Sequence, residues 1–264
     1  MLMVECKDIR KRILELAFNA GSNGSHLGGS LSSVEILNAL YNSGINTNTN
    51  DEARDRVILS KGHSALAHYC ILESIGILSK EDTDTFEKNG TVLFAHAKRN
   101  VNKGIEFSGG SLSLGASFAV GVALACKDKG INNRVFVLLG DGECDEGLVW
   151  ESVMAAVNYR LDNIVFIVDC NGLQSDGFTK EIMDHSPLEE KFKGFGCDVL
   201  SVDGHSVQEL TKAYSVRPFE KPLAIIAHTV KGKGVSFMEN LQNWHHGSLS
   251  QSQYEQALEE VSHE

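Results

Sequence analysis

Short apolar runs alternate with amphipathic stretches along most of the chain. The runs at 135–139 and 164–168 contain no polar residue and lead into glycine, aspartate or asparagine, which predicts buried strands that end at turns. Further strands are expected at 56–60, 198–202 and 223–228. Helices are expected at 1–19, 32–41, 65–75, 116–129, 147–160, 188–195, 207–216 and 253–261. This alternation indicates an α/β fold with a mostly parallel, doubly wound sheet flanked by helices.

Nothing in the sequence divides the chain into separate folding units. It contains three prolines and shows no internal repeat, low-complexity tract or proline-rich linker. Its 264 residues lie near the upper limit for one hydrophobic core, so we expect a single domain over residues 1–264. Residues 21–29 are expected to separate the first two helices as a turn. Residues 231–234, which alternate lysine and glycine, are expected to form a solvated loop.

The charge and the apolar content argue against binding to nucleic acid and against a span across a membrane. The net charge of −11 argues against nucleic acid, and no apolar run approaches the roughly 20 residues that span a membrane. The first 20 residues interleave charged and apolar side chains, which is typical of an amphipathic helix and not of a signal peptide. The six cysteines are scattered without a CxxC pair, which favours reduced thiols in a cytoplasmic protein.

Two polar motifs directly follow the strands at 135–139 and 164–168. They place Asp141 and Asn171 at the carboxyl ends of neighbouring parallel strands, where α/β sheets usually bind ligands. Leu173 can add a backbone carbonyl, and three such oxygen ligands suit a hard cation that arrives with phosphate. Gly140 and Gly142 let backbone N–H groups approach an anion at the start of the next helix. Together these residues predict a metal-bridged diphosphate site.

This spacing of Gly-Asp-Gly and, about thirty residues later, Asn resembles the thiamine diphosphate signature of thiamine-dependent enzymes. Within that group the chain is most similar to transketolases, on motifs that cover roughly residues 20–250. The matching segments are Ser25-His26-Leu27-Gly28-Gly29, Ser60-Lys61-Gly62-His63-Ser64, His96 by its spacing from Gly110, Gly110-Ser111-Leu112, residues 140–147, and Trp244-His245-His246-Gly247.

The resemblance implies a cofactor, a metal and a set of site residues. The cofactor is thiamine diphosphate, and Mg²⁺ or Ca²⁺ would be bound by Asp141, Asn171 and the Leu173 carbonyl. The residues implied to contact the cofactor are His63, Gly110, Leu112, Gly140, Asp141, Gly142, Glu143, Glu146, Asn171 and His245. The implied catalytic residues are His26, His63, His96 and His245, whose imidazoles can move protons at sugar oxygens.

Several points stay open within this resemblance. Counting from Trp244 favours His245 over His246 as the histidine that faces the site. The other histidines, His68, His185, His205, His228 and His263, are expected to be core or surface residues. Lys231 and Lys233 could meet a substrate phosphate, although a solvated loop is favoured. Family members often have Gly-Gln where this chain has Ser113-Leu114, which predicts a different shape around the cofactor's pyrimidine.

The resemblance also implies a partner chain. Transketolases contain a pyrimidine-binding domain, which supplies the glutamate that activates the cofactor, and a C-terminal domain; neither is expected within residues 1–264. The chain therefore resembles the N-terminal subunit of a split transketolase, in which those domains lie on a separate polypeptide and the two chains form an α2β2 assembly. Glu146 would link to the cofactor site across subunits. The reaction would move a two-carbon ketol unit from a ketose phosphate to an aldose phosphate.

Two other functions remain possible from the sequence. One is a different thiamine-dependent carbon–carbon transfer, as in the α-subunit of a 2-oxoacid dehydrogenase or a synthase that condenses pyruvate with an aldehyde. The other is a non-catalytic domain that binds the cofactor or a partner without turnover. The histidine set favours ketose chemistry, but the sequence does not determine the donor and acceptor sugars.

Overall fold

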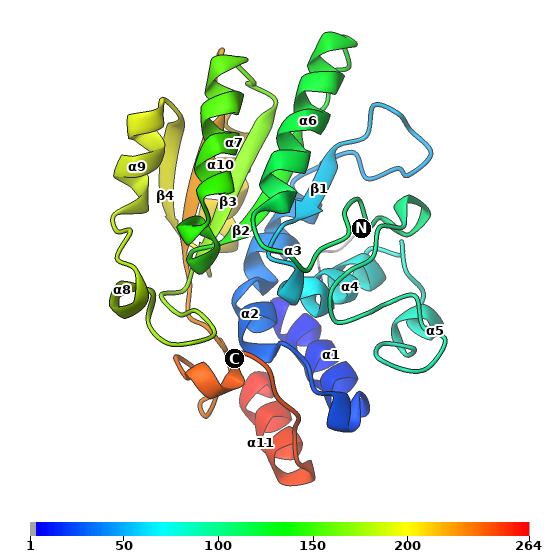
Figure 1. Ribbon diagram of the computed structural model, residues 1–264. Helices are drawn as coiled ribbons and strands as arrows, with labels where there is room; N and C mark the ends of the chain where they lie inside the picture. Colours follow the sequence, from blue (N-terminus) through cyan, green and yellow to red (C-terminus); the bar gives the residue numbers. More distant parts are fainter. Residues whose placement is uncertain (1–3, 264) are drawn as a thin grey trace.

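A five-stranded parallel sheet forms the centre of the computed structural model, which describes residues 4–263 (Figure 1). The strand order is β1-β2-β3-β5-β4, so the chain adds strands outward from β1 to β3 and then inserts β5 between β3 and β4. The strands are β1 Arg56–Leu59, β2 Val135–Gly140, β3 Ile164–Cys170, β4 Asp198–Asp203 and β5 Leu223–His228. The predicted α/β fold with a parallel, doubly wound sheet is confirmed.

Each predicted helix has a counterpart in the structure. The helices are α1 Cys6–Asn19, α2 Leu27–Ser32, α3 Val34–Asn42, α4 Ala65–Ser74, α5 Lys80–Thr83, α6 Leu114–Asp128, α7 Gly147–Asn158, α8 Thr179–Ile182, α9 Leu188–Phe195, α10 Val207–Ser215 and α11 Gln251–Ser262. The first was expected from residue 1, and residues 1–3 of that prediction lie outside the described residues. The short helices α5 and α8 were not predicted.

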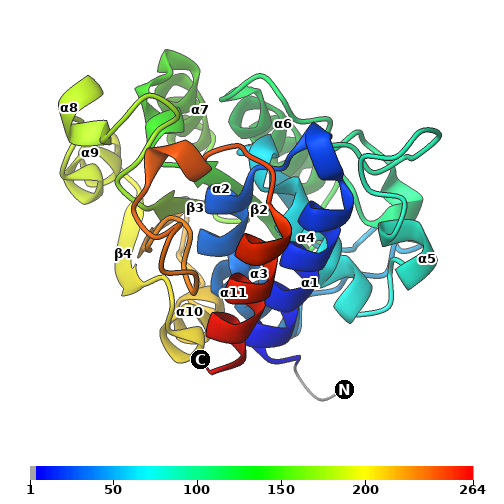
Figure 2. The same ribbon diagram turned by 90° about the horizontal axis from the view of Figure 1, so that it is seen from below.

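Alternate strand residues enter two separate cores, one on each face of the sheet. Phe136 and Leu138 of β2 join a core that includes side chains of α1, α3, α4 and α10. Val135 and Val137 point the other way, into a core with side chains of α6, α7 and α9. Figures 1 and 2 show these two helical layers on opposite sides of the sheet. Because both faces are covered, the central strands β2, β3 and β5 are nearly continuous apolar runs. The edge strand β4 differs, because Asp198, Ser201 and Asp203 interrupt its apolar residues.

The stretch at 21–29 differs from its predicted turn. Only residues 21–23 form a short 3₁₀ turn, and Gly28 and Gly29 lie buried inside helix α2. A Cβ at Gly28 would lie 2.9 Å from the backbone oxygen of Trp244, and one at Gly29 would lie 2.8 Å from the His63 ring. These glycines therefore allow helix α2 to pack closely against its neighbours and do not reverse the chain. The prediction of a turn over the whole of 21–29 was wrong because it took the glycines as a sign of a loop.

The first and last helices lie together on one side of the molecule. Helices α1 and α11 pack side by side (Figure 2). The rings of Phe18 and Tyr254 stack between them, with centroids 4.4 Å apart. Within residues 4–263 there is no helix with the length and apolar character that crossing a membrane requires.

Helix α6 offers a matched pair of glycines to test how tightly it packs on β1. A Cβ at Gly115 would lie 2.6 Å from the Cα of Ser60, whereas nothing lies within 4 Å of one at Gly121. We expect Gly115→Ala to lower the free energy of unfolding by about 1–3 kcal/mol through overpacking. Gly121→Ala should be neutral or stabilise by up to ~1 kcal/mol, because alanine favours the helix. Urea denaturation measures both, and equal effects of the two changes would contradict the close packing.

Candidate active site

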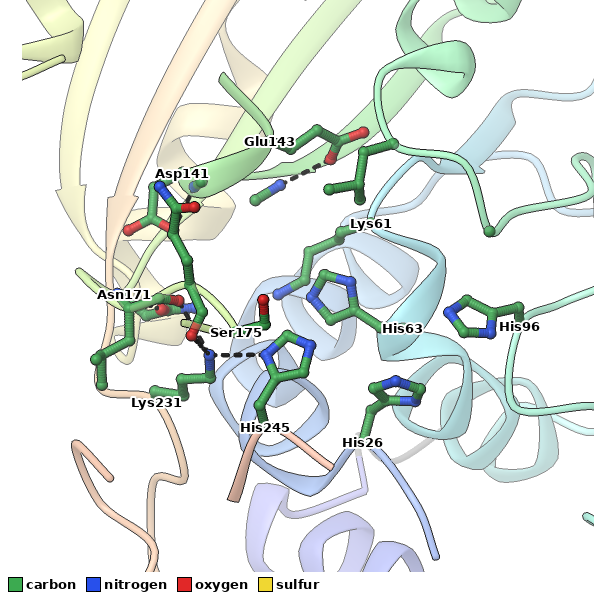
Figure 3. A pocket seen from close by; sticks show the side chains of 16 residues that line it. His26, Lys61, His63, His96, Asp141, Glu143, Asn171, Ser175, Lys231 and His245 are labelled. Carbon is green, nitrogen blue, oxygen red and sulfur yellow. Dashed lines mark hydrogen bonds between the residues drawn. The ribbon is translucent and has the colours of Figure 1, made fainter. Parts of the chain in front are cut away.

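The carboxyl ends of four strands surround one pocket. Lys61 follows β1, Asp141 follows β2, Asn171 follows β3 and Lys231 lies three residues beyond β5. Their side chains line a cavity of about 220 Å³ (Figure 3). The pocket is therefore at the edge of the sheet where ligands bind in open α/β folds, as the sequence predicted.

The structure brings together all but one of the residues that the sequence singled out. The pocket is lined by His26, His63, His96, Gly110, Leu112, Gly140, Asp141, Gly142, Glu143, Asn171, Leu173 and His245. Glu146 is the exception: it is exposed at the N-cap of α7 and does not line the pocket. Of the remaining lining residues, Lys61, Gln174 and Ser175 were not predicted to belong to the site, and Lys231 was considered for a substrate phosphate but assigned to a solvated loop.

One wall of the pocket presents oxygen atoms from two strand ends. The Asp141 carboxylate accepts hydrogen bonds from the backbone N–H groups of Gly142 at 2.8 Å and Gly172 at 2.5 Å, so the β2 and β3 turns are tied together. The side-chain oxygen of Asn171 accepts from the Leu173 N–H at 3.1 Å, which fixes the amide. These bonds hold a carboxylate, an amide oxygen and a backbone carbonyl in place before any ligand binds.

This oxygen wall fits a hard cation. Burial, followed by the negative charge of Asp169, raises the pKa of Asp141 to about 6, so the free carboxylate lacks a full counter-charge. No group of three or more His, Cys, Asp or Glu side chains in residues 4–263 could hold a metal by itself. Oxygen donors of mixed type, such as Asp141, Asn171 and the Leu173 carbonyl, are the set that Mg²⁺ and Ca²⁺ accept when phosphate and water complete the shell.

Lys231 is buried in the pocket, so the prediction of a solvated loop was wrong for this residue. Only 1% of its surface is exposed. Its ammonium donates to the backbone carbonyls of Leu173 and Gln174 and to Nδ1 of His245, each at 3.0 Å. Burial, and then the charge of Lys61, lowers the pKa of Lys231 to about 8. A signal was present in the sequence, because Lys231 lies three residues after a predicted strand, at the same sheet edge as Asp141.

Four histidines form the opposite side of the pocket (Figure 3). The ring of His26 has its centroid 4.9 Å from that of His96, 5.6 Å from His245 and 6.0 Å from His63. Nδ1 of His26 is buried and has no hydrogen-bond partner within the described part of the chain. A buried, unpaired ring nitrogen in a polar pocket is suited to a ligand hydroxyl, because leaving it unpaired is costly.

Burial keeps the rings of His26, His63 and His245 neutral. Desolvation, followed by the neighbouring histidines, lowers the pKa of His26 to about 3, and desolvation with Lys231 lowers that of His245 to about 4. The pKa of His63 is also well below its usual value, mainly because of burial. The bond from Lys231 requires Nδ1 of His245 to be the acceptor, which selects the tautomer protonated at Nε2.

The structure distinguishes His245 from His246. His245 lines the pocket, whereas His246 is exposed, with its ring centroid 4.6 Å from that of His26. A Cβ at Gly24 would lie 2.9 Å from the His246 ring, so glycine makes room for it there. The count from Trp244 that favoured His245 therefore agrees with the pocket geometry.

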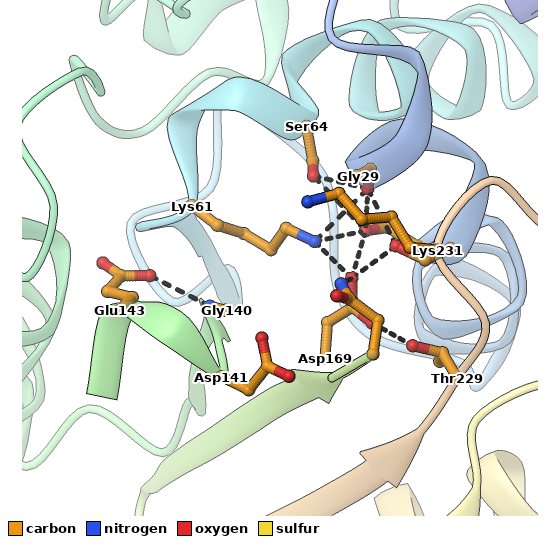
Figure 4. Close-up of polar contacts among 12 residues, drawn as sticks. Gly29, Lys61, Ser64, Gly140, Asp141, Glu143, Asp169, Thr229 and Lys231 are labelled. Carbon is orange, nitrogen blue, oxygen red and sulfur yellow. Dashed lines mark hydrogen bonds and ion pairs between the residues drawn. The ribbon is translucent and has the colours of Figure 1, made fainter. Parts of the chain in front are cut away.

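An ion pair joins Lys61, which lines the pocket, to Asp169 (Figure 4). Both side chains are completely buried. Asp169 also accepts hydrogen bonds from Ser32 at 2.6 Å and from Thr229, while Lys61 donates to the Gly29 carbonyl at 3.2 Å. Burial opposes ionisation of Asp169, but Lys61 and these hydroxyl donors together hold its pKa below the usual value. No local pattern of residues indicates this pair, whose members lie 108 residues apart.

The remaining histidines contribute elsewhere. His68 is buried against Tyr41, with Nε2 2.7 Å from the phenol oxygen. His185 and His205 pair with Asp145 and Glu35 at 2.5 and 2.9 Å. None of them lines the pocket, as expected from the sequence.

The fold and the site together define an α/β protein with a pocket of charged and polar side chains at the carboxyl edge of its sheet. Residues 7–263 match the family described as the thiamine diphosphate binding domain of transketolase. The chain belongs to this family.

Relatives of similar length are named as single subunits of transketolases. The chain is 39% identical to one subunit of the apulose-4-phosphate transketolase of Phocaeicola vulgatus, over 99% of this chain and 94% of that protein. It is 39% identical to a 6-deoxy-6-sulfo-D-fructose transketolase subunit of a Clostridium species, over 97% of this chain and 94% of that protein. Human transketolase is 33% identical over 96% of this chain, which spans only 41% of that longer protein.

Solved transketolases share the fold. The enzyme from Campylobacter jejuni aligns with a TM-score of 0.84 and 28% identity, over 97% of this chain and 43% of that one. The enzyme from Leishmania mexicana aligns with a TM-score of 0.87 at 24% identity, over 99% of this chain and 42% of that one. These neighbours agree with the predicted thiamine diphosphate-binding fold.

The buried ion pair generates a stability prediction. We expect Asp169→Asn to lower the free energy of unfolding by about 3–5 kcal/mol, because it leaves the Lys61 charge buried and uncompensated. Glu220→Gln is the control, since Glu220 forms an exposed pair with Arg160 at 3.4 Å, and breaking such pairs typically costs about 0–1 kcal/mol. Urea denaturation at neutral pH measures both. A cost for Asp169→Asn no larger than that of the control would contradict a structural role for the pair.

Proposed function

We propose that this chain is the diphosphate- and metal-binding subunit of a two-subunit transketolase that uses thiamine diphosphate. The observation that supports this most directly is the pocket itself, in which the oxygens of Asp141, Asn171 and Leu173 face four histidines across one cavity. Family membership and the relatives named as subunits support the same assignment.

The oxygen wall would bind the metal and the diphosphate. Asp141, the Asn171 amide oxygen and the Leu173 carbonyl would hold Mg²⁺ or Ca²⁺. Gly140 and Gly142 would lie beside the diphosphate, while their own N–H groups donate to the Glu143 and Asp141 carboxylates. Lys231 would add positive charge beside the Leu173 carbonyl, to which its ammonium donates at 3.0 Å.

The histidine wall would act on the substrate. When bound, thiamine diphosphate supplies the carbanion stabilisation that breaking and forming a carbon–carbon bond requires. His26, His96 and His245 would bind substrate oxygens and move protons there. The low pKa values of His26 and His245 leave both rings neutral at pH 7, so each ring offers one donor and one acceptor.

Other residues would complete the cofactor site. His63, Gly110 and Leu112 would contact the cofactor, in line with their place in the pocket wall. Glu143 lines the same wall, but three hydrogen bonds already engage its carboxylate. Glu146, exposed at the start of α7, would act at the contact between subunits.

Apolar side chains near the pocket support a missing partner. Phe94 lies two residues from His96, Leu114 two from Leu112 and Leu241 four from His245, and all three apolar residues are at least 41% exposed. The cavity of about 220 Å³ is also smaller than the roughly 300–1,000 Å³ typical of small-molecule sites. We propose that a separate subunit with the pyrimidine-binding and C-terminal domains covers this surface and completes the site, in an α2β2 assembly.

The substrates would be sugar phosphates. A two-carbon ketol unit would pass from a ketose phosphate to an aldose phosphate. A specialised donor sugar is the second candidate, because the 39%-identical relatives are named for apulose 4-phosphate and 6-deoxy-6-sulfo-D-fructose. The six cysteines are all unpaired, which agrees with the reducing cytoplasm where we propose that the enzyme acts.

Asp141 provides the test of the metal and diphosphate site. We expect Asp141→Ala to abolish detectable binding of thiamine diphosphate in the presence of Mg²⁺, because the metal loses its only carboxylate ligand from this chain. Asp162→Ala is the matched control, since Asp162 lies just before β3, at the opposite edge of the sheet. Calorimetric titration of both variants decides the point, and unchanged affinity in Asp141→Ala would rule out the assignment. Chelation of the metal should weaken binding to the unaltered chain.

The need for a partner is tested by assay. The chain alone should show no ketol transfer from xylulose 5-phosphate to ribose 5-phosphate, and addition of the partner subunit should produce turnover. Replacing xylulose 5-phosphate with apulose 4-phosphate or 6-deoxy-6-sulfo-D-fructose compares the donor candidates. Turnover by the isolated chain would show that the site is complete without a partner.

A further inference from the structure

Ser113 has a backbone conformation that its residue type disfavours. Its φ is +69°, in the left-handed region that glycine adopts readily and other residues rarely adopt. The residue is 4% exposed and lies between Leu112, which lines the pocket, and helix α6. The turn at Ser113 therefore connects the pocket wall to helix α6. A residue other than glycine keeps a positive φ only where surrounding contacts stabilise that conformation.

The Glu143 carboxylate is the group that holds the turn. Its Oε1 accepts from the Ser113 N–H at 2.7 Å and from the Ser60 hydroxyl at 2.5 Å, and its Oε2 accepts from the Gly140 N–H at 3.0 Å. Glu143 is 2% exposed. One carboxylate thus joins the end of β1, the start of α6 and the end of β2; Figure 4 shows its bond to Gly140.

Close packing leaves this loop little freedom around the carboxylate. A Cβ at Gly109 would lie 2.9 Å from the Cα of Gly62, and one at Gly115 would lie 2.6 Å from the Cα of Ser60. Residues 109–115 are therefore pressed against residues 60–62 at both ends, and Ser113 lies between the two contacts. A change of φ at Ser113 would displace Leu112 and Gly110 from the pocket wall.

We propose that Glu143 is a positioning residue that stabilises the left-handed turn at Ser113 and so presents Gly110 and Leu112 to the cofactor. This differs from the direct cofactor contact that the sequence resemblance implied for Glu143, and it rests on the proposed function for the identity of the ligand. The bond from the Ser113 N–H would offset the strain of the positive φ.

The test combines Glu143→Gln with two changes at position 113. Glutamine keeps the shape of Glu143 but places an NH₂ group among donors, so the hydrogen bonds cannot all form. We expect this variant to bind thiamine diphosphate with Mg²⁺ about tenfold or more weakly, as is usual for residues that orient ligand contacts. Adding Ser113→Gly should recover most of the affinity, because glycine needs no help to adopt φ +69°. Adding Ser113→Ala is the control and should recover none.

Calorimetry on the full chain measures affinity, and amide hydrogen exchange at Ser113 without ligand reports the turn itself. Faster exchange in Glu143→Gln, with rescue of affinity by glycine and not alanine, supports the proposal. Unchanged affinity in Glu143→Gln, or equal rescue by both residues, overturns it.

If the unaltered chain binds no thiamine diphosphate, the proposed function fails. In that case unchanged hydrogen exchange at Ser113 in Glu143→Gln would separately overturn the role of Glu143. Should Glu143→Gln unfold, recovery of folding by glycine but not alanine supports the same conclusion, and equal recovery overturns it.

Discussion

The buried ion pair between Lys61 and Asp169 fixes the rest of the site. Two opposite charges removed from water are tolerable only when they are close and their remaining hydrogen-bonding positions are filled. The pair meets both conditions with donors and acceptors from α2 and from the segment after β5. Any separation of these segments would expose an uncompensated charge to a dry interior, so the strand ends that bear His63 and Asn171 keep one relative placement.

That placement brings negative and positive side chains together at the pocket. The carboxylates of Asp141 and Asp169 and the ammonium groups of Lys61 and Lys231 lie within one buried cluster, beside histidines that burial keeps neutral. This mixture of charges suits the proposed joint binding of a cation and an anion, since either one alone would leave charge unbalanced in a region with little water. A metal bound to a diphosphate has that composition.

This chain supplies the polar walls of the pocket and leaves apolar side chains close to them in the sequence exposed. The sheet edge and the loops of this chain supply the oxygen and histidine walls, and the exposed side chains of Phe94 and Leu114 each lie two residues along the chain from a lining residue. Both features agree with a two-chain enzyme in which the present chain provides rigid contacts to the cofactor's charged end. The left-handed turn at Ser113 belongs to the same rigid wall, because Glu143 ties it to the ends of β1 and β2.

The sequence by itself determined the strands, most helices and the position of the site, because continuous apolar runs, strand-ending turns and the edge reached by parallel strands are properties of short segments. It identified twelve of the sixteen lining residues, including Asp141 and His245. The tertiary structure alone decided that Gly28 and Gly29 lie within a helix, that Lys231 is buried, and that Glu143 is engaged by Ser60, Ser113 and Gly140. These features depend on close contacts between residues that are distant along the chain, and such contacts leave no local pattern of hydrophobicity or turn chemistry.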